Sequence, residues 1–262
     1  MKSDIDLARP AEVVVRQDAI VALTRENGRV TVDELSAHFD VTPQTIRRDL
    51  NELAARRVLQ RVHGGAVFAT GVANLEYEKR RQLAATEKAA IGEAAASLIP
   101  EGASLFINIG STTEAVADAL QSRRALMVIT NNINVANRLR LQPQIEVVIA
   151  GGVVRGSDGG IVGEAASDFI RQFKVDYAVI GTSAIDADGA LLDYDFREVR
   201  VAQAIIENAR HVILVADATK FDRTAPVRIA HLSQVHTFVT DHCTPAFRSV
   251  CSENEVRLIE TG

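Results

Sequence analysis

The chain has 262 residues, of which 47% are hydrophobic and 24% are charged, and its net charge is −5 at neutral pH. This composition is typical of a soluble globular protein with one or two domains. The amino-terminal residues lack the continuous apolar run of a signal peptide or membrane span, which predicts a cytoplasmic protein with no membrane partner. The two cysteines, Cys243 and Cys251, are then expected to be free thiols.

Three helices are predicted near the amino end. The first covers residues 16–27, with apolar side chains on its inner side. The second begins at Thr31, because Thr31 and Glu34 have the spacing of a capping box. Residues 40–41 form a short turn, and Thr42 followed by Pro43 favours the start of a third helix. Two helices joined by so short a turn indicate a helix-turn-helix.

The third helix has one apolar face and several polar ones. Ile46, Leu50 and Leu53 are spaced to form the apolar face. The other faces carry side-chain types that bond base edges and phosphates: Gln44, Thr45, Arg47, Arg48 and Asn51. This pattern predicts a helix that lies in the major groove of DNA.

A hairpin is predicted to follow this helix. Residues 58–62 and 66–67 favour two strands around His63-Gly64-Gly65, where paired glycines permit a tight turn. Arg61 and His63 are then placed to reach phosphate or the minor groove. The alternative is a small solvated helical domain whose arginines only keep it soluble.

The motif TPQTIRRDLNEL followed by RVHGGA resembles the signature of the DeoR family of bacterial transcriptional repressors. The resemblance implies a winged helix-turn-helix in residues 1–67 and double-stranded operator DNA as the partner. The expected DNA-binding residues are Thr42, Gln44, Thr45, Arg47, Arg48, Asn51, Arg61 and His63.

Charge is unevenly distributed along the chain. The first 67 residues are neutral overall, with ten Lys+Arg against ten Asp+Glu, whereas residues 42–67 carry +3. A basic surface of this size binds DNA weakly as a single copy, since affinity scales with the number of phosphates neutralised. We therefore expect a homo-oligomer, a dimer or a tetramer, on a palindromic or repeated site.

Residues 68–85 lack a clear period and are predicted to be a linker. From residue 86 onward, helix-like stretches such as 112–121 and 197–209 alternate with strand-like ones such as 104–109 and 211–217. Such alternation predicts an α/β domain over residues 86–262, with a mainly parallel sheet covered by helices on both faces.

Small and polar residues follow five of the predicted strands. Ligands of open α/β sheets bind beyond the carboxyl ends of the strands, so these turns are candidate ligand-binding segments. The first also offers hydroxyls and a helix amino terminus, which suit a phosphate. Any one such turn has a local explanation as a turn or cap, but five at one sheet edge favour a ligand site. They are 110–113, 130–132, 151–152, 181–183 and 217–220.

The segments LFINIGSTTEAVADAL, TNNINVAN, AGGVVRGSDGGIVGEAA and ENARHVILVADATKF also resemble the DeoR family. This resemblance implies a second domain with the fold of ribose-5-phosphate isomerase, which senses phosphorylated sugars or polyols. It implies phosphate binding by Gly110, Ser111, Thr112 and Thr113. Further ligand-binding candidates are Thr130, Asn131, Gly151, Gly152, Gly181, Glu198 and Lys220. Asn108 departs from the family, whose members usually have aspartate there.

The function predicted is a repressor of a sugar or polyol catabolic operon, controlled by a small phosphorylated metabolite such as glycerol 3-phosphate. Alternatives are a regulator that senses a different phosphosugar and an isomerase-like enzyme. Glu198 and Lys220 match isomerase positions, but the acidic Asp-Gly-Ala-Asp stretch of the isomerases is Ile180-Gly181-Thr182-Ser183 here. A pocket without those acids is expected to bind without catalysis.

Metal binding is a third possibility, because five metal-ligating side chains lie in the carboxyl-terminal part of the chain: His231, His236, His242, Cys243 and Cys251. Their spacing matches no compact zinc site. We therefore expect neither a metal nor a cofactor.

Overall fold

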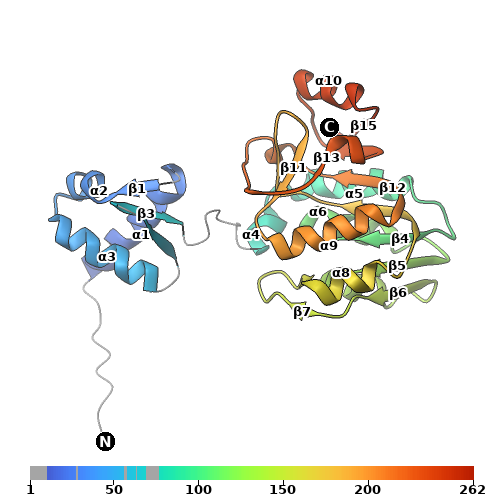
Figure 1. The fold of residues 1–262 in the computed structure, drawn as a ribbon, viewed down its shortest axis with the longest axis horizontal. Coiled ribbons are helices and arrows are strands. Elements are labelled where there is room, and N and C mark those ends of the chain that lie inside the picture. The colour runs from blue at the N-terminus through green and yellow to red at the C-terminus, as the bar shows by residue number, and fades with distance from the viewer. Residues whose placement is uncertain (1–10, 28, 56–57, 63, 69–76) are drawn as a thin grey trace, which may run out of the picture. The chain divides into compact units, whose positions relative to one another are not determined.

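The computed structural model describes residues 11–27, 29–55, 58–62, 64–68 and 77–262. The chain divides into two compact units, residues 1–74 and 75–262. Each unit has its own hydrophobic core. Figure 1 shows both units and labels many of their elements.

The described part of the first unit contains three helices and a three-stranded sheet of order β1-β3-β2. Its elements are α1 (Ala11–Asn27), β1 (Arg29–Thr31), α2 (Val32–Phe39), α3 (Pro43–Ala55), β2 (Leu59–Val62) and β3 (Gly65–Phe68). Ile20, Leu35, Ile46 and Leu50 are fully buried between them. The apolar face predicted for the third helix is therefore its core face.

Local signals in this unit were well predicted. The capping box is formed, because the Thr31 hydroxyl accepts from the Glu34 N–H while the Glu34 carboxylate accepts from the Thr31 N–H. The turn after α2 contains Asp40 in the left-handed region, with φ 50°. The predicted hairpin is also present, as β2 pairs antiparallel with β3. Strand β1, which adds a third strand to the hairpin, was not predicted.

The second unit is built on a seven-stranded sheet of order β15-β14-β12-β9-β4-β5-β6 within residues 77–262. Every pairing in it is parallel. The strands are β4 (Ser104–Ile107), β5 (Leu126–Thr130), β6 (Ile145–Ile149), β9 (Val175–Ile180), β12 (Ala209–Val215), β14 (Thr237–Thr240) and β15 (Arg257–Glu260). The predicted parallel α/β sheet is thus confirmed.

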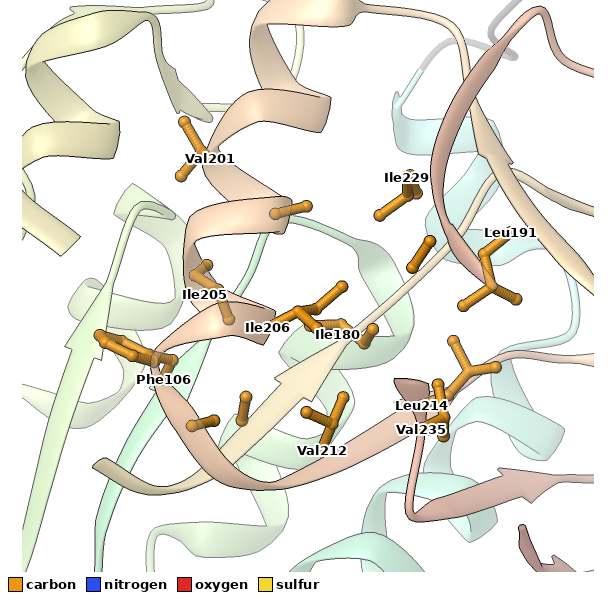
Figure 2. Packing of buried hydrophobic residues seen from close by; sticks show 14 of the residues in the cluster. Phe106, Ile180, Leu191, Val201, Ile205, Ile206, Val212, Leu214, Ile229 and Val235 are labelled. Carbon is orange, nitrogen blue, oxygen red and sulfur yellow. The ribbon is translucent and has the colours of Figure 1, made fainter. Parts of the chain in front are cut away.

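Helices cover both faces of this sheet. One face packs against α5 (Ala85–Ser97), α6 (Ser111–Leu120) and α7 (Ile133–Leu139). The other packs against α8 (Glu164–Ile170), α9 (Phe196–Glu207) and α10 (Pro245–Glu253). Successive side chains of β4 alternate between the two cores, with Ile107 in the first and Phe106 in the second. Figure 2 shows part of the second core, to which Phe106, Ile180 and Leu214 of the sheet and Ile205 of α9 contribute.

Short strands lie at the edge where the main strands of the sheet end. They are β7 (Val153–Val154), β8 (Ile161–Val162), β10 (Ala184–Ile185), β11 (Ala190–Asp193) and β13 (Val227–His231). β7 and β8 form a hairpin, and β10-β11-β13 form a small antiparallel sheet. Two 3-10 turns, η1 (Ala218–Lys220) and η2 (Leu232–Gln234), complete the unit.

The segment predicted as a linker, residues 68–85, differs from that expectation. Residues 77–82 form helix α4 (Tyr77–Gln82), and α5 begins at Ala85. α4 packs against α6, inside the second unit. This helix was not predicted because its sequence has no apolar period. Polar contacts hold it in place instead.

Candidate DNA-binding surface and effector pocket

The exposed face of α3 is the candidate DNA-binding surface. The Thr42 hydroxyl caps the helix by accepting from the Thr45 N–H at 3.2 Å, and Pro43 occupies the first helical position. Thr45 is half-buried, and its hydroxyl lies 2.9 Å from that of Thr42. The remaining predicted side chains of the helix are exposed: Gln44, Arg47, Arg48 and Asn51.

The acidic residues of α3 are turned away from that face or paired. Asp49 is buried and accepts from Arg16 Nε of α1 at 2.7 Å and from Gln17 Nε2 at 3.2 Å. Glu52 pairs with Arg48 at 3.4 Å. Asp49 therefore fixes α1 against α3, and its charge does not oppose DNA at the exposed face.

The hairpin that follows α3 depends on two glycines. Gly64 has a φ of +76°, and a Cβ on Gly65 would lie 2.0 Å from the Val30 carbonyl oxygen, so the turn and the close approach of β1 both require glycine. Arg61 belongs to β2. The predictions for the Arg61 side chain and for His63 lie outside the described residues.

The candidate effector pocket lies where the strand order of the main sheet reverses. After β4 the chain builds β5 and β6 on one side, and it returns with β9 to build the other side. In open α/β sheets, ligands bind at such a switch point, beyond the carboxyl ends of the strands. A pocket with a cavity volume of about 30 Å³ lies there. Its lining residues are Ile109, Gly110, Ser111, Thr112, Thr113, Gly181, Thr182, Ser183, Asp193, Glu198, Val215 and Lys220.

The amino terminus of α6 forms one wall of the pocket. Gly110 precedes the helix with a φ of +149° and has no side chain to cap it. The first helical hydrogen bond runs from the Glu114 N–H to the Gly110 carbonyl at 3.0 Å. The N–H groups of residues 111–113 therefore precede the helical ladder. The Thr113 hydroxyl fixes the turn by donating to the Asn108 carbonyl at 2.7 Å and the Gly110 carbonyl at 2.8 Å.

Lys220 supplies a positive charge to the same pocket. It is the last residue of η1, whose first turn is capped by Asp217 through the Thr219 N–H at 3.2 Å. Only 8% of Lys220 is exposed. A buried ammonium group beside uncapped helical N–H groups suits an anion.

Two carboxyl groups, those of Asp193 and Glu198, also line the pocket. Burial raises the pKa of Glu198 to about 8, and the charge of Asp193 adds to this rise, whereas Arg155 opposes it. Arg155 lies 2.5 Å from Glu198 but shares its charge with Asp158 at 2.6 Å and Asp195 at 3.2 Å. Burial therefore favours the protonated form of Glu198, whereas Arg155, whose Nη2 donates to Glu198 Oε2, favours the carboxylate.

The structure brings together three of the five predicted turns, but not the other two. Thr130 and Asn131 are fully buried, and their side chains bond to the backbone of other segments. Thr130 Oγ1 donates to the Ile107 carbonyl at 2.7 Å, and Asn131 Nδ2 donates to the Ile161 carbonyl at 3.1 Å. Gly151 and Gly152 precede the β7–β8 hairpin, and Gly152 has a φ of +148°. These four residues are not among the lining residues of this pocket, and their assignment to ligand binding stays a prediction.

Sequence reasoning singled out Arg155 after a predicted strand but did not predict its ion pairs with Asp158, Asp195 and Glu198. Asp193 ends β11, and Arg155 lies after β7, so both come from short strands without a periodic signal. Asn108 is 2% exposed, and its side-chain oxygen accepts no hydrogen bond from a described residue. Cys243 and Cys251 are free and buried.

A winged helix-turn-helix followed by an α/β domain with an anion-suited pocket defines a ligand-responsive transcriptional regulator. The chain belongs to the DeoR family. Residues 16–72 match the DeoR-like helix-turn-helix domain, and residues 83–242 match the DeoR C terminal sensor domain. Among the described residues, no helix is both long and apolar enough to cross a membrane.

Relatives along nearly the whole chain are named repressors. The glycerol-3-phosphate regulon repressor of Escherichia coli K12 is 45% identical over 93% of this chain and 97% of its own. Its counterpart in Haemophilus influenzae is 46% identical over 94% and 96%. The HTH-type transcriptional repressor CsqR of Escherichia coli K12 is 39% identical over 93% and 94%. The chain is thus a regulator rather than an enzyme.

Among solved structures, ribose 5-phosphate isomerase A from Methanocaldococcus jannaschii is similar to 53% of this chain over 55% of its own. The two are 16% identical, with a TM-score of 0.39. A likeness of this size carries no argument about activity.

Proposed function

We propose that the protein represses a sugar or polyol catabolic operon and that a phosphorylated polyol, glycerol 3-phosphate, controls it. The polyol enters the pocket and lowers the affinity of the protein for its operator. DNA binds to the exposed face of α3, where Arg47 and Arg48 meet phosphates or guanines. The phosphate group of the effector binds at the amino terminus of α6. The names of the two glycerol-3-phosphate regulon repressors support the choice of effector.

One observation carries the proposal: the uncapped amino terminus of α6 and the buried Lys220 line the same pocket. A phosphate monoester carries close to two negative charges at neutral pH, and both features stabilise negative charge. The hydroxyls of Ser111 and Thr112 supply further donors beside the helix end. Burial raises the pKa of Glu198, and protonation of this group reduces the repulsion that two carboxylates in the pocket would exert on a phosphate.

The DNA-binding unit supports a homo-oligomer. One exposed helix face with two arginines neutralises few phosphates, so a stable complex requires at least two copies on a repeated or palindromic site. The proposed location is the cytoplasm, since the DNA partner is found there.

The alternative effector is a different phosphosugar. It differs from glycerol 3-phosphate in chain length and hydroxyl number rather than in the phosphate group. A panel separates them. Glycerol 3-phosphate is expected to bind more tightly than inorganic phosphate, five-carbon sugar phosphates and six-carbon sugar phosphates, with affinities measured by calorimetry on the DNA-free protein.

Lys220→Met tests the site directly. Loss of the buried charge is expected to weaken glycerol 3-phosphate binding at least tenfold, since charge-assisted bonds to phosphate are the strong ones. Lys174→Met is the matched control, because Lys174 is exposed at the amino end of β9 and donates to the Glu207 carbonyl at 2.9 Å. Equal affinities in the two variants would reject the proposed site.

A further inference from the structure

We propose that helix α4 transmits the state of the pocket toward the DNA-binding unit, through one polar link at each of its ends. The inference rests on the proposed function of the pocket as the effector site. α4 is the first element of the second unit and has six residues. Because so short a helix is not stable on its own, contacts with the rest of the unit set its position.

The first link joins Tyr77, at the start of α4, to the phosphate-binding end of α6. The Tyr77 hydroxyl donates to Glu114 Oε2 at 2.5 Å. Glu114 follows Thr113 directly, and its own N–H makes the first hydrogen bond of α6. Burial, and then the hydrogen bond to Glu114, raises the pKa of Tyr77 above its ordinary value. The phenol therefore remains a donor at physiological pH.

Glu114 is the centre of a buried polar cluster. Its side chain accepts from Asn132 Nδ2 at 3.2 Å and from Asn134 Nδ2 at 3.1 Å, and it pairs with Arg138 at 3.1 Å. Asn134 Nδ2 also donates to the Tyr77 hydroxyl at 3.0 Å. With Glu114 2% exposed, a shift of the first turn of α6 moves an acceptor that cannot turn to water instead. The Tyr77 side chain must move with Glu114 or lose its hydrogen bond to the Glu114 carboxylate.

The second link joins the other end of α4 to the element that carries Lys220. Lys88 of α5 is 4% exposed, and its ammonium group donates to the carbonyl of Leu83, the residue just after α4. The same ammonium group lies 3.8 Å from Asp217 Oδ2. Asp217 caps η1, which ends in Lys220.

The two links converge on the two groups that would hold the phosphate. An anion between the amino terminus of α6 and Lys220 attracts both. The first is connected to one end of α4 through Glu114, and the second to the other end through Asp217 and Lys88. A ligand shifts an equilibrium only by its differential affinity for two states, so the positions of these links must differ between the bound and free pocket. A movement of either link on anion binding therefore displaces α4.

The test uses the full-length protein, a duplex from the region upstream of its own gene, and glycerol 3-phosphate as the probe. The quantity measured is the ratio of operator Kd values with and without saturating probe. For the unaltered protein we expect a ratio of ~5 to 150. Tyr77→Phe keeps the ring and removes the hydroxyl, and Lys88→Met removes the second link. Each is expected to lower the ratio at least threefold.

Three further readings separate transmission from a structural role. In Tyr77→Phe, the probe's Kd for the DNA-free protein and the operator Kd without probe are both expected to stay within twofold of the unaltered values. Tyr177→Phe, on β9, is the matched control and should keep the full ratio. If the unaltered protein responds to the probe and the Tyr77→Phe and Lys88→Met variants respond equally well, the inference is wrong while the proposed function stands. If no phosphate compound changes operator binding by the unaltered protein, the proposed function fails and the inference fails with it.

Discussion

The two helices that face the proposed ligands begin in opposite ways. α3 is N-capped by the Thr42 hydroxyl, which accepts from the Thr45 N–H. Its lateral face is exposed to solvent. α6 is preceded by Gly110, which has no side chain, and it presents its end to a pocket. In α3 the cap satisfies the Thr45 N–H and Pro43 has no N–H, so few backbone donors remain and the exposed side chains are the groups that suit DNA. An uncapped helix keeps those donors for a ligand.

This difference matches the two targets. Reading a DNA groove requires a row of side chains of varied chemistry along a rigid cylinder, which the face of α3 supplies. Holding a phosphate requires several N–H groups that converge on one point, which the end of α6 supplies. Each helix is anchored from behind by a buried carboxylate, Asp49 in one and Glu114 in the other.

Closing the end of α6 is expected to have the largest effect. Ser111→Asp places a carboxylate at the first helical position, where it is compatible with the helix but repels an anion. Two charges a few ångströms apart near a protein surface interact by about 4 kcal/mol, so phosphate affinity should fall at least ~100-fold. Calorimetry with glycerol 3-phosphate measures this loss.

The same substitution at Ser122, just after the carboxyl end of α6, is the control and should leave affinity within twofold. Operator binding by the ligand-free Ser111→Asp protein should also be preserved. Retained phosphate affinity in Ser111→Asp would place the anion elsewhere.

Shortening a side chain on α3 is expected to have the next largest effect. Arg47→Ala should weaken operator binding by ~1–3 kcal/mol if this exposed guanidinium reads a guanine, with no change in phosphate affinity. Binding of labelled duplex at fixed salt measures the change, and the same substitution at Arg171, exposed in the second unit, is the control. Unchanged operator affinity would remove Arg47 from the reading surface.

How far sequence alone predicts these two helices depends on the range of the interactions involved. Thr42, Pro43 and the spacing of Ile46 and Leu50 act within one or two turns, so the start and the buried face of α3 were predictable. The Gly110–Thr113 turn was likewise recognisable because it follows a buried strand. Both predictions use contacts that are local in sequence.

What the sequence did not predict depends on pairs distant in the chain. Asp49 meets Arg16 across 33 positions, Glu198 meets Arg155 across 43, and Tyr77 meets Glu114 across 37. No periodic pattern encodes such pairs. Strand-end position likewise does not specify the partner of a polar group, as with the Thr130 hydroxyl, which donates to the Ile107 carbonyl 23 positions away.

Raising the pH is expected to have the smallest effect. The pKa of Glu198 is raised to about 8 by burial, so this group is mostly neutral at pH 7 and acquires a negative charge as the pH rises through 8. An anionic ligand binds the neutral form better, and phosphate affinity should therefore decrease by ~3- to 10-fold between pH 7 and pH 9. Glu198→Gln, which cannot ionise, should lose most of this dependence. A steeper decrease in the glutamine variant would contradict the assignment.

The most direct test of the account is a titration of glycerol 3-phosphate into the full-length protein bound to the duplex from upstream of its own gene. The account predicts release of the DNA at ligand concentrations near the calorimetric Kd, and continued binding by Ser111→Asp under the same conditions. An operator complex that withstands glycerol 3-phosphate and every sugar phosphate of the panel at saturating concentration would contradict it.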